Sequence, residues 1–159
     1  MLSPIRWWGR IPWLFYLVSL FVGYIERRRS PLDPVLRSLV SARIAQLCHC
    51  EFCIDITSMT LAARAEPGQA AGGRRLAQQY AVQRKERLAL AYAEAATQTP
   101  PAVDDALRSA MAAHFDARAL TELTALIGLQ NLSARFNAAM AIPAQGLCQI
   151  PTSSSQNKE

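Results

Sequence analysis

The stretch SLVSARIAQLCHCEFCIDITS, residues 38–58, carries the strongest structural and chemical signals in the chain. It contains three cysteines and a histidine within six positions, at Cys48, His49, Cys50 and Cys53. Apolar residues spaced three and four apart flank this cluster on both sides, a pattern typical of two helices joined by a short turn. We therefore expect the CxxC pair to lie at the N-terminal end of the second helix.

Three interpretations of the cluster compete. A structural zinc site needs four ligands, usually in two separated pairs, and only one pair is present, so a metal site from Cys48 or His49 with Cys50 and Cys53 is a minor alternative. Buried cysteines can also act as small hydrophobic residues, which would suit Cys48. Two cysteines at i and i+3 lie on one helix face, close enough to form a disulfide, and the helix N-terminus favours a thiolate. Redox chemistry is the favoured interpretation, and no metal or cofactor is predicted.

Length, charge and cysteine count limit the class of protein. A chain of 159 residues can form one domain with its own core. Its four cysteines are mostly bunched together, which indicates a site and not a disulfide framework. The net charge of +5 comes from arginines spread along the chain without alternating aromatic residues, so nucleic-acid binding is not predicted. We expect a cytoplasmic protein.

The remaining periodic segments predict an all-α fold. Ser30–Pro34 is a break followed by a helix start, because Asp33 can cap the free amides and proline suits the first helical turn. No segment alternates apolar and polar residues as a strand would. A loop is expected around residues 67–73, where Pro-Gly and Gly-Gly pairs occur. The expected helices span residues 34–47, 51–64, 84–97, 103–114 and 116–140.

The N-terminal segment IPWLFYLVSLFVGYI, residues 11–25, has no charged side chain. As a helix it would be about 22 Å long, which is short of the ~30 Å hydrocarbon core of a bilayer. It also lacks the cleavage site of a signal peptide. A buried or subunit-interface helix is favoured, while membrane-surface contact stays open because basic residues flank both ends. We divide the chain into residues 1–29, a domain at 30–148 and a mobile tail at 149–159.

Residues 38–58 resemble the core of the carboxymuconolactone decarboxylase / alkyl hydroperoxidase D (AhpD)-like family, in which a helix, a CxxC pair and a second helix follow one another. Segments 86–97, 114–140 and 143–148 agree with the family in order and spacing, so the resemblance covers roughly residues 30–148. It implies an all-α helical bundle that assembles into trimers or hexamers. For peroxidase members it also implies a dithiol that reduces hydroperoxides and is restored by an external thiol or a lipoyl-type reductant.

The resemblance also implies roles for the two cysteines. By position, Cys53 corresponds to the thiol that attacks the peroxide and Cys50 to the thiol that resolves the intermediate. Helix-terminus electrostatics alone would instead favour Cys50 as the attacking thiol, because it is the more N-terminal of the two. Cys50 is also expected to be the more exposed thiol. Decarboxylase members use a different pocket and need no cysteine pair, so the CxxC argues against decarboxylation here.

The proton relay of the peroxidase members is where this sequence departs from the family. Ser38 stands where those members carry a glutamate, and Phe52 and Thr57 stand where they carry histidines. General acid–base help typically contributes about 10²–10⁴-fold, so a slow peroxidase is expected unless other groups act. The hydroxyls of Ser38 and Thr57 are themselves candidates for proton handling. The other candidates are His49, Glu51 and Asp55 nearby, and Glu86, Glu94 and Glu122 farther along the chain.

Several residues have a second interpretation. On a helix that begins near Cys50, Asp55 lies two positions from Cys53 and is expected to point away from it. Cys148 is expected to be a packed thiol of the terminal segment, and His114 a surface or capping residue. Three polar residues of the long last helix are expected to be hydrogen-bonding anchors, with lining of the thiol pocket as the alternative. These are Gln130, Asn131 and Arg135.

The leading hypothesis is a CxxC-dependent thiol redox protein with alkyl hydroperoxidase activity, which the missing relay would make weak. The alternative is a catalytically degenerate family member that acts as an oligomeric scaffold or redox-sensing accessory protein. The missing relay residues and the aromatic N-terminal segment both favour this alternative.

Overall fold

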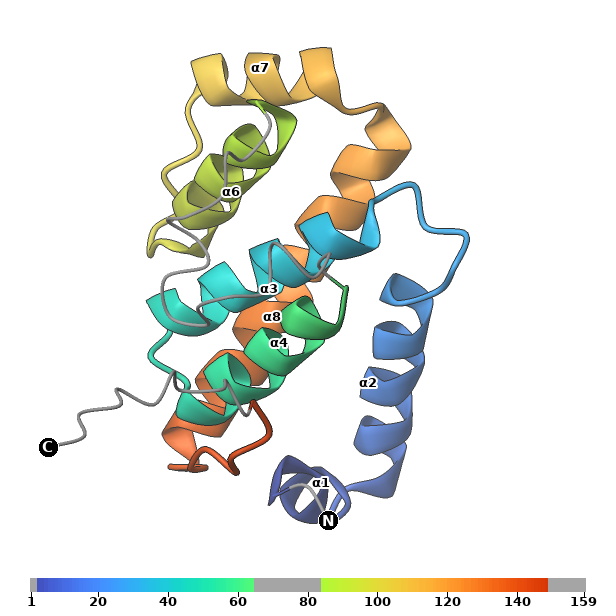
Figure 1. The fold of residues 1–159 in the computed structure, drawn as a ribbon, viewed down its shortest axis with the longest axis vertical. Helices are drawn as coiled ribbons and strands as arrows, with labels where there is room; N and C mark the ends of the chain where they lie inside the picture. Colours follow the sequence, from blue (N-terminus) through green and yellow to red (C-terminus); the bar gives the residue numbers. More distant parts are fainter. Residues whose placement is uncertain (1–2, 65–83, 149–159) are drawn as a thin grey trace, which may run out of the picture.

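The computed structural model describes residues 3–64 and 84–148, and within them the chain is helical without any strand (Figure 1). The all-α prediction is therefore confirmed. The expected loop around residues 67–73 and the expected tail at 149–159 lie outside the described residues. The helices are α1 (Ser3–Trp8), α2 (Pro12–Ile25), α3 (Pro34–Leu47), α4 (Glu51–Arg64), α6 (Arg84–Thr97), α7 (Asp105–His114) and α8 (Ala117–Ala139).

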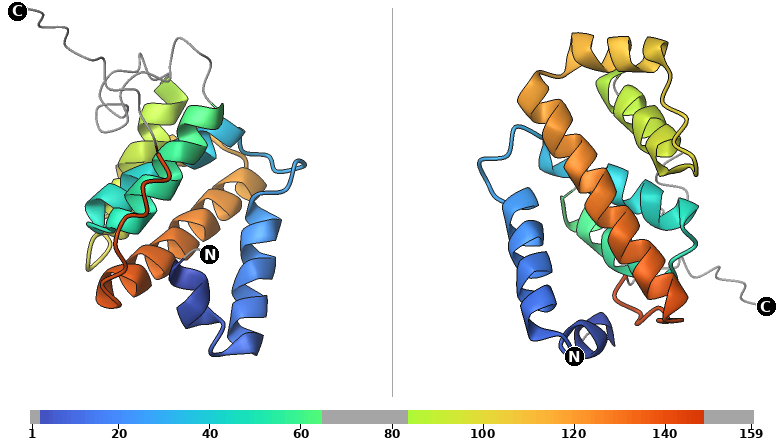
Figure 2. Two further views of the ribbon diagram at one scale, coloured as in Figure 1. Left: turned by 60° about the horizontal axis from the view of Figure 1, so that its bottom comes forward. Right: turned by 180° about the vertical axis from the view of Figure 1, so that it is seen from behind.

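Helix α3 is the centre of the bundle and packs against α4, α6 and α8. The long helix α8 crosses behind α3 and α4, as the view from behind shows (Figure 2). The apolar face predicted for α3 does point inward, since Leu36, Val40 and Ile44 are buried in the main core. The apolar spacing of residues 51–64 and 116–140 also predicts that Met59 and Ala138 face inward. This prediction is wrong, because both are exposed on their helices.

Aspartate caps set the starts of three helices. Asp33 accepts hydrogen bonds from the amides of Val35 and Leu36 at 2.8 and 3.1 Å, as predicted. An aspartate directly before the last apolar segment likewise predicts a cap, and Asp116 does accept a hydrogen bond from the Ala119 amide at the start of α8. Helix α7 begins two residues later than expected because Asp104, not an earlier residue, accepts from the first-turn amide of Leu107 at 2.7 Å.

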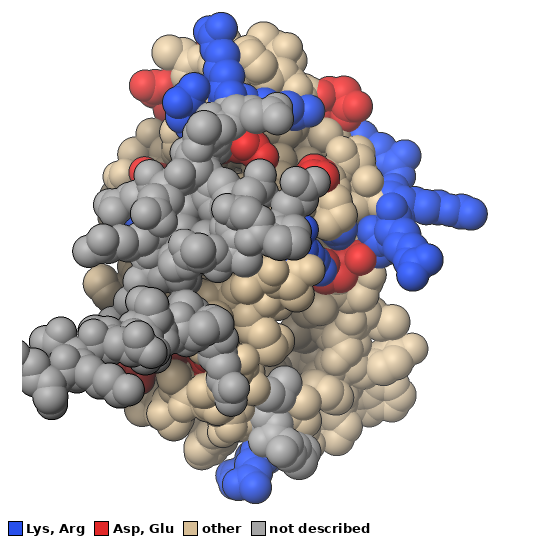
Figure 3. Space-filling model, viewed as in Figure 1, with Lys and Arg blue, Asp and Glu red and all other residues tan. Residues whose placement is uncertain are grey.

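Helix α2 lies at the side of the bundle and exposes most of its apolar side chains. The expectation of a helix buried within the chain is therefore wrong. Trp13 is 80% exposed, Leu17 61% and Tyr24 57%, and with Leu20 they form one stripe at helical spacing. The surface over this helix carries no charged side chain, whereas basic side chains gather beyond its C-terminal end (Figure 3). Within the described residues, no helix is long and apolar enough to cross a bilayer.

The N-terminal helices are held to the bundle at their ends and not along their length. The Trp8 ring packs on Phe136 with centroids 4.2 Å apart, and Gln145 exchanges hydrogen bonds with Ser3. Ile25, the last residue of α2, is buried in the main core. Between these two attachments α2 runs along the side of the bundle (Figures 1 and 2), and its Val18 and Val22 line clefts shared with α3 and α8.

Candidate functional site: the cysteine pair between α3 and α4

The turn that carries the CxxC is a Schellman motif. His49 has a φ of 51°, its amide donates to the Gln46 carbonyl at 3.1 Å, and the Cys50 amide donates to the Ala45 carbonyl at 3.1 Å. This left-handed conformation usually selects glycine, but here histidine adopts it and reverses the chain. The turn leaves His49 exposed and directs Cys50 inward, immediately before α4.

Cys50 and Cys53 are joined by a disulfide with their Cα atoms 5.2 Å apart. The pair stands at the N-terminal end of α4, as predicted, and the Cys53 amide donates to the Cys50 sulfur at 3.2 Å. The expectation that Cys50 is the more exposed thiol is wrong, since Cys50 is 1% and Cys53 2% exposed. The physical reason is the Schellman turn, which packs Cys50 against the apolar residues of the turn and not toward solvent.

A second Schellman motif, at the end of α8, completes the wall around the pair. Ala141 has a φ of 49°, and the Ile142 amide donates to the Asn137 carbonyl at 3.0 Å. This turn brings Ile142 into the same buried cluster as Cys50 and Cys53. The other members of the cluster are Ala45, Phe52 and Ala134.

Among the described residues, Asn137 is the one whose side chain donates a hydrogen bond to a sulfur atom of the pair. It is 1% exposed, and its amide nitrogen donates to the Cys53 sulfur at 3.3 Å. Its Oδ1 atom is buried and has no hydrogen-bond partner among the described residues. Sequence reasoning missed this residue because it assigned the neighbouring Ala138 to the inner face. The signal was present, since Asn137 follows the buried Ala134 at a spacing of three.

A cleft of about 270 Å³ opens beside Cys53, between α2, α3, α4 and α8. Cys53 belongs to its lining and Cys50 does not. The predicted candidates Ser38 and Thr57 both line it, yet the Thr57 hydroxyl donates to the Cys53 carbonyl at 2.6 Å and the Ser38 hydroxyl to the Pro34 carbonyl at 3.1 Å. Their hydroxyl hydrogens are therefore already engaged. The other lining residues are Val22, Glu26, Ser41, Phe52, Ile56, Thr60, Arg64, Gln130 and Ser133.

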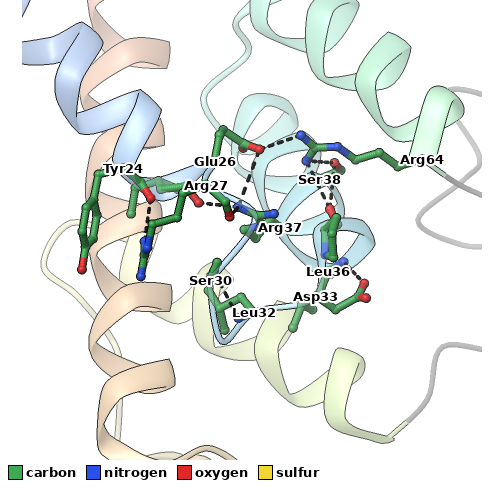
Figure 4. A network of polar contacts seen from close by, with 12 residues as sticks. Tyr24, Glu26, Arg27, Ser30, Leu32, Asp33, Leu36, Arg37, Ser38 and Arg64 are labelled. Carbon is green, nitrogen blue, oxygen red and sulfur yellow. Dashed lines mark hydrogen bonds and ion pairs between the residues drawn. The ribbon is translucent and has the colours of Figure 1, made fainter.

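The rim of the cleft carries a network of ion pairs (Figure 4). Arg64 donates to Glu26 at 2.6 Å and to the Ser38 hydroxyl at 2.9 Å. Arg37 lies 3.8 Å from the same Glu26 carboxylate. Glu26 is the one carboxylate among the described residues that line the cleft, and two guanidinium groups hold it. Sequence reasoning did not select it because it follows the apolar N-terminal segment, far along the chain from the cysteines.

Asp55 points away from the sulfur atoms, as expected, and binds the C-terminal segment. Its carboxylate accepts three backbone hydrogen bonds, from Gln145 and Leu147 at 2.9 Å and from Cys148 at 2.7 Å. Burial opposes ionisation of Asp55, but these backbone donors outweigh it and hold the pKa below its usual value. Asp55 therefore pins the segment that follows α8.

The other predicted carboxylates are not placed against Cys53. Glu51 is exposed in the first turn of α4, and Glu86 lies in the first turn of α6. Glu94 is paired with Arg43 at 2.7 Å. Glu122 is bound by Arg27 and Ser30, and although burial opposes its ionisation these partners hold its pKa below the usual value.

The two remaining cysteines are free and lie apart from the pair. Cys48 is half-buried with its sulfur 3.7 Å from the Asn131 side chain. Burial raises its pKa, although Arg135 opposes this. Burial and then the Asp55 charge raise the pKa of Cys148. Within residues 3–64 and 84–148, no three His, Cys, Asp or Glu side chains gather into a group that could hold a metal.

The predicted anchors of α8 do connect helices. Asn131 donates to the Thr97 hydroxyl at 3.0 Å, and Arg135 donates to the Thr97 carbonyl at 3.1 Å, so both tie α8 to the end of α6. Gln130 instead lines the cleft beside Cys53. His114 is exposed at the end of α7, as expected.

With a disulfide-bonded CxxC between two packed helices, the fold and site define a class of all-α dithiol proteins. Residues 16–95 match the model of the carboxymuconolactone decarboxylase family, and the chain belongs to that family. It is 69% identical over 156 residues to the Uncharacterized protein YnjA of Escherichia coli (strain K12). The aligned region covers 95% of this chain and 84% of YnjA.

Solved structures share the fold at low sequence identity. The debrominase Bmp8 superimposes with a TM-score of 0.76 at 20% identity, over 87% of this chain and 75% of Bmp8. A protein of Agrobacterium tumefaciens superimposes with a TM-score of 0.75 at 20% identity, over 89% of this chain and 97% of that protein. It is named as a candidate antioxidant defence protein AhpD. The predicted family resemblance and AhpD-like fold are therefore confirmed.

Proposed function

We propose that this protein is a CxxC-dependent thiol oxidoreductase with a slow hydroperoxidase activity. The observation that carries the proposal is the disulfide-bonded pair at the start of α4 with one of its two cysteines, Cys53, on the wall of a cleft. A disulfide that closes only four residues constrains the unfolded chain little, so it suits a redox step better than a structural one. The AhpD-like fold supports the same activity class.

The proposed cycle has three balanced steps. The Cys53 thiolate attacks the outer oxygen of a hydroperoxide, the O–O bond breaks, and Cys53 becomes a sulfenic acid while an alcohol leaves after taking up a proton. The Cys50 thiol then condenses with the sulfenic acid, which forms the disulfide and releases water. Two electrons from an external dithiol, of lipoyl type or another, reopen the disulfide and leave the reductant oxidised.

The position of Cys53 supports its assignment as the attacking thiol. Cys53 lines the cleft through which a small hydroperoxide could approach, whereas Cys50 does not. Cys50 is bonded to Cys53 at the start of α4, which supports its assignment as the thiol that resolves the sulfenic acid. Both assignments agree with the roles that the family resemblance implies.

The slow rate is expected because, among the described residues, the side-chain hydrogen bond to the Cys53 sulfur comes from the Asn137 amide, which carries no acidic proton. Thr57 and Ser38 use their hydroxyl hydrogens on backbone carbonyls, and Phe52 has none to give. Glu26 reaches the cleft but is held by two arginines. An alkoxide leaving group needs a proton, so the contribution of general acid catalysis, about 10²–10⁴-fold, is expected to be largely absent.

Free-thiol titration after stoichiometric hydroperoxide tests this function. The reduced protein should lose two thiols and regain them with dihydrolipoamide, Cys50→Ser should accumulate a sulfenic acid, and Cys53→Ser should not react at that site. Cys148→Ser, which removes a half-buried free thiol, is the matched control and should behave as the unsubstituted protein. The proposal fails if the unsubstituted protein consumes hydroperoxide no faster than the variant that lacks both Cys50 and Cys53.

A second candidate function is an oligomeric scaffold or redox-sensing accessory protein. The exposed apolar stripe of α2 favours it, because an apolar helix left in water is typical of a surface that binds a partner. A second copy of the chain is the favoured partner, in line with the expected trimer or hexamer, and a membrane surface is the alternative. This function gains if the cysteine pair proves inert to hydroperoxide while the protein still self-associates.

A further inference from the structure

Asn137 occupies a position that ordinary packing does not explain. Its side chain is 1% exposed within the cluster that surrounds the cysteine pair, where apolar residues would pack at lower cost. The large majority of buried side-chain polar atoms have a hydrogen-bond partner. Asn137 uses the end that faces Cys53, and its Oδ1 has no partner among the described residues.

We propose that Asn137 is a catalytic residue whose amide N–H stabilises the Cys53 thiolate in the reduced protein. The inference rests on the proposed function, since it concerns the state of the attacking thiol. A thiolate buried to this extent would be costly in an apolar cluster without a donor. A hydrogen bond to the charged form of a group favours that form, and the amide nitrogen lies 3.3 Å from the sulfur.

The donor from α8 also distinguishes the two cysteines. The Cys50 sulfur accepts from the backbone amide of Cys53, which is part of the helix start. The Cys53 sulfur receives its donor from a side chain on another helix. Within the described part of the chain each sulfur therefore has one hydrogen-bond donor, and Asn137 offsets the advantage that the helix terminus gives to Cys50.

An amide stabilises an anion but has no proton to release at neutral pH. Asn137 can therefore assist formation of the thiolate without protonating a leaving alkoxide. Attack on a disulfide needs no such proton, because its leaving group departs as a thiolate. The reduced pair should therefore react readily with alkylating agents and disulfides, and slowly with hydroperoxides.

The test is the pH dependence of Cys53 alkylation by iodoacetamide, measured on the Cys53 peptide by mass spectrometry in the full chain carrying Cys50→Ser. Asn137→Leu keeps the approximate shape and removes the donor. Its Cys53 titration midpoint should rise by about one to two pH units, which corresponds to the loss of one hydrogen bond to a charged group. Alkylation at pH 7 should fall about tenfold or more.

Asn131→Leu is the matched control, since Asn131 lies on the same helix and contacts the unrelated Cys48. It should leave the Cys53 midpoint unchanged. An unchanged midpoint in Asn137→Leu overturns the proposal, and so does an equal shift in both variants.

A second measurement applies if Asn137→Leu does not fold. The reduced chain without substitutions is titrated with pH and followed by NMR. The chemical shifts of the Asn137 side-chain amide should change over the pH range in which Cys53 titrates. Signals that do not move through that pH range overturn the proposal. Neither measurement uses hydroperoxide, so a failure of the proposed peroxidase activity and a failure of this inference give different results.

Discussion

The turn around Cys50 and the helix α2 are both rich in apolar residues, yet those of the turn are buried and most of those of α2 are exposed. Around the cysteine pair, two Schellman turns direct Ala45, Cys50 and Ile142 into one buried cluster. Helix α2 instead presents Trp13 and Leu17 to solvent. An apolar segment is buried only where other elements supply a surface to cover it, and this bundle supplies one to the turn but not to α2.

The largest expected effect compares one apolar residue from each region. Phe52→Ala removes a side chain that is 5% exposed, and should lower the free energy of unfolding by about 3 kcal/mol. Leu17→Ala removes one that is 61% exposed, and should change it by less than about 0.5 kcal/mol. Urea unfolding of the dilute protein measures both. A similar loss of unfolding free energy in both variants would contradict the exposure of α2, because it would mean that this helix is covered in solution.

A smaller effect is expected at Asp55, which fastens the segment after α8 beside the cysteine turn. Asp55→Asn should lower the free energy of unfolding by about 2 kcal/mol at pH 7, since three backbone donors lose a charged acceptor. The pKa of this carboxyl is lowered in the folded state. Its stabilisation is therefore present above the unfolded pKa of about 3.9 and is lost as the pH falls through the folded pKa.

The difference between the unsubstituted protein and Asp55→Asn should accordingly shrink when unfolding is repeated at successively lower pH. Glu51→Gln is the control, because Glu51 lies exposed on the same helix, and it should cost less than about 1 kcal/mol. A difference that stays constant as the pH falls below 4 would contradict the role given to the Asp55 charge.

The smallest effect on folding, but a clear one on association, is expected from the α2 stripe. Trp13→Ser combined with Leu20→Ser should leave the free energy of unfolding of the single chain within about 0.5 kcal/mol per site. It should lower the sedimenting mass of the protein toward that of one 17.5 kDa chain, because the apolar surface for a second copy is lost.

Met59→Ser, a substitution of an exposed apolar residue on α4, is the control and should leave the sedimenting mass unchanged. An unchanged mass in the α2 variant would refute self-association through this stripe. Loss of binding to anionic phosphatidylglycerol vesicles in the α2 variant alone would instead assign the stripe to a membrane surface.

The features that depend on neighbouring residues along the chain could be predicted from the amino-acid sequence. The apolar periodicity of residues 34–47, the caps at Asp33 and Asp116 and the CxxC at the head of α4 were all predictable, because helix formation and capping act within a few residues. The closeness of the Cys50 and Cys53 side chains was likewise predictable, because residues three apart lie on one face of a helical turn.

The features that join distant segments appear only in the folded bundle. The contact of Asn137 with Cys53 spans 84 positions. The Asp55 carboxylate accepts hydrogen bonds from backbone amides 90 to 93 positions away. Helix α2 was recognisable as a helix, but its exposure depends on which other elements lie against it. Local propensity carries no information on these contacts, because they arise only when the whole bundle packs and each buried polar group takes the partner that packing brings to it.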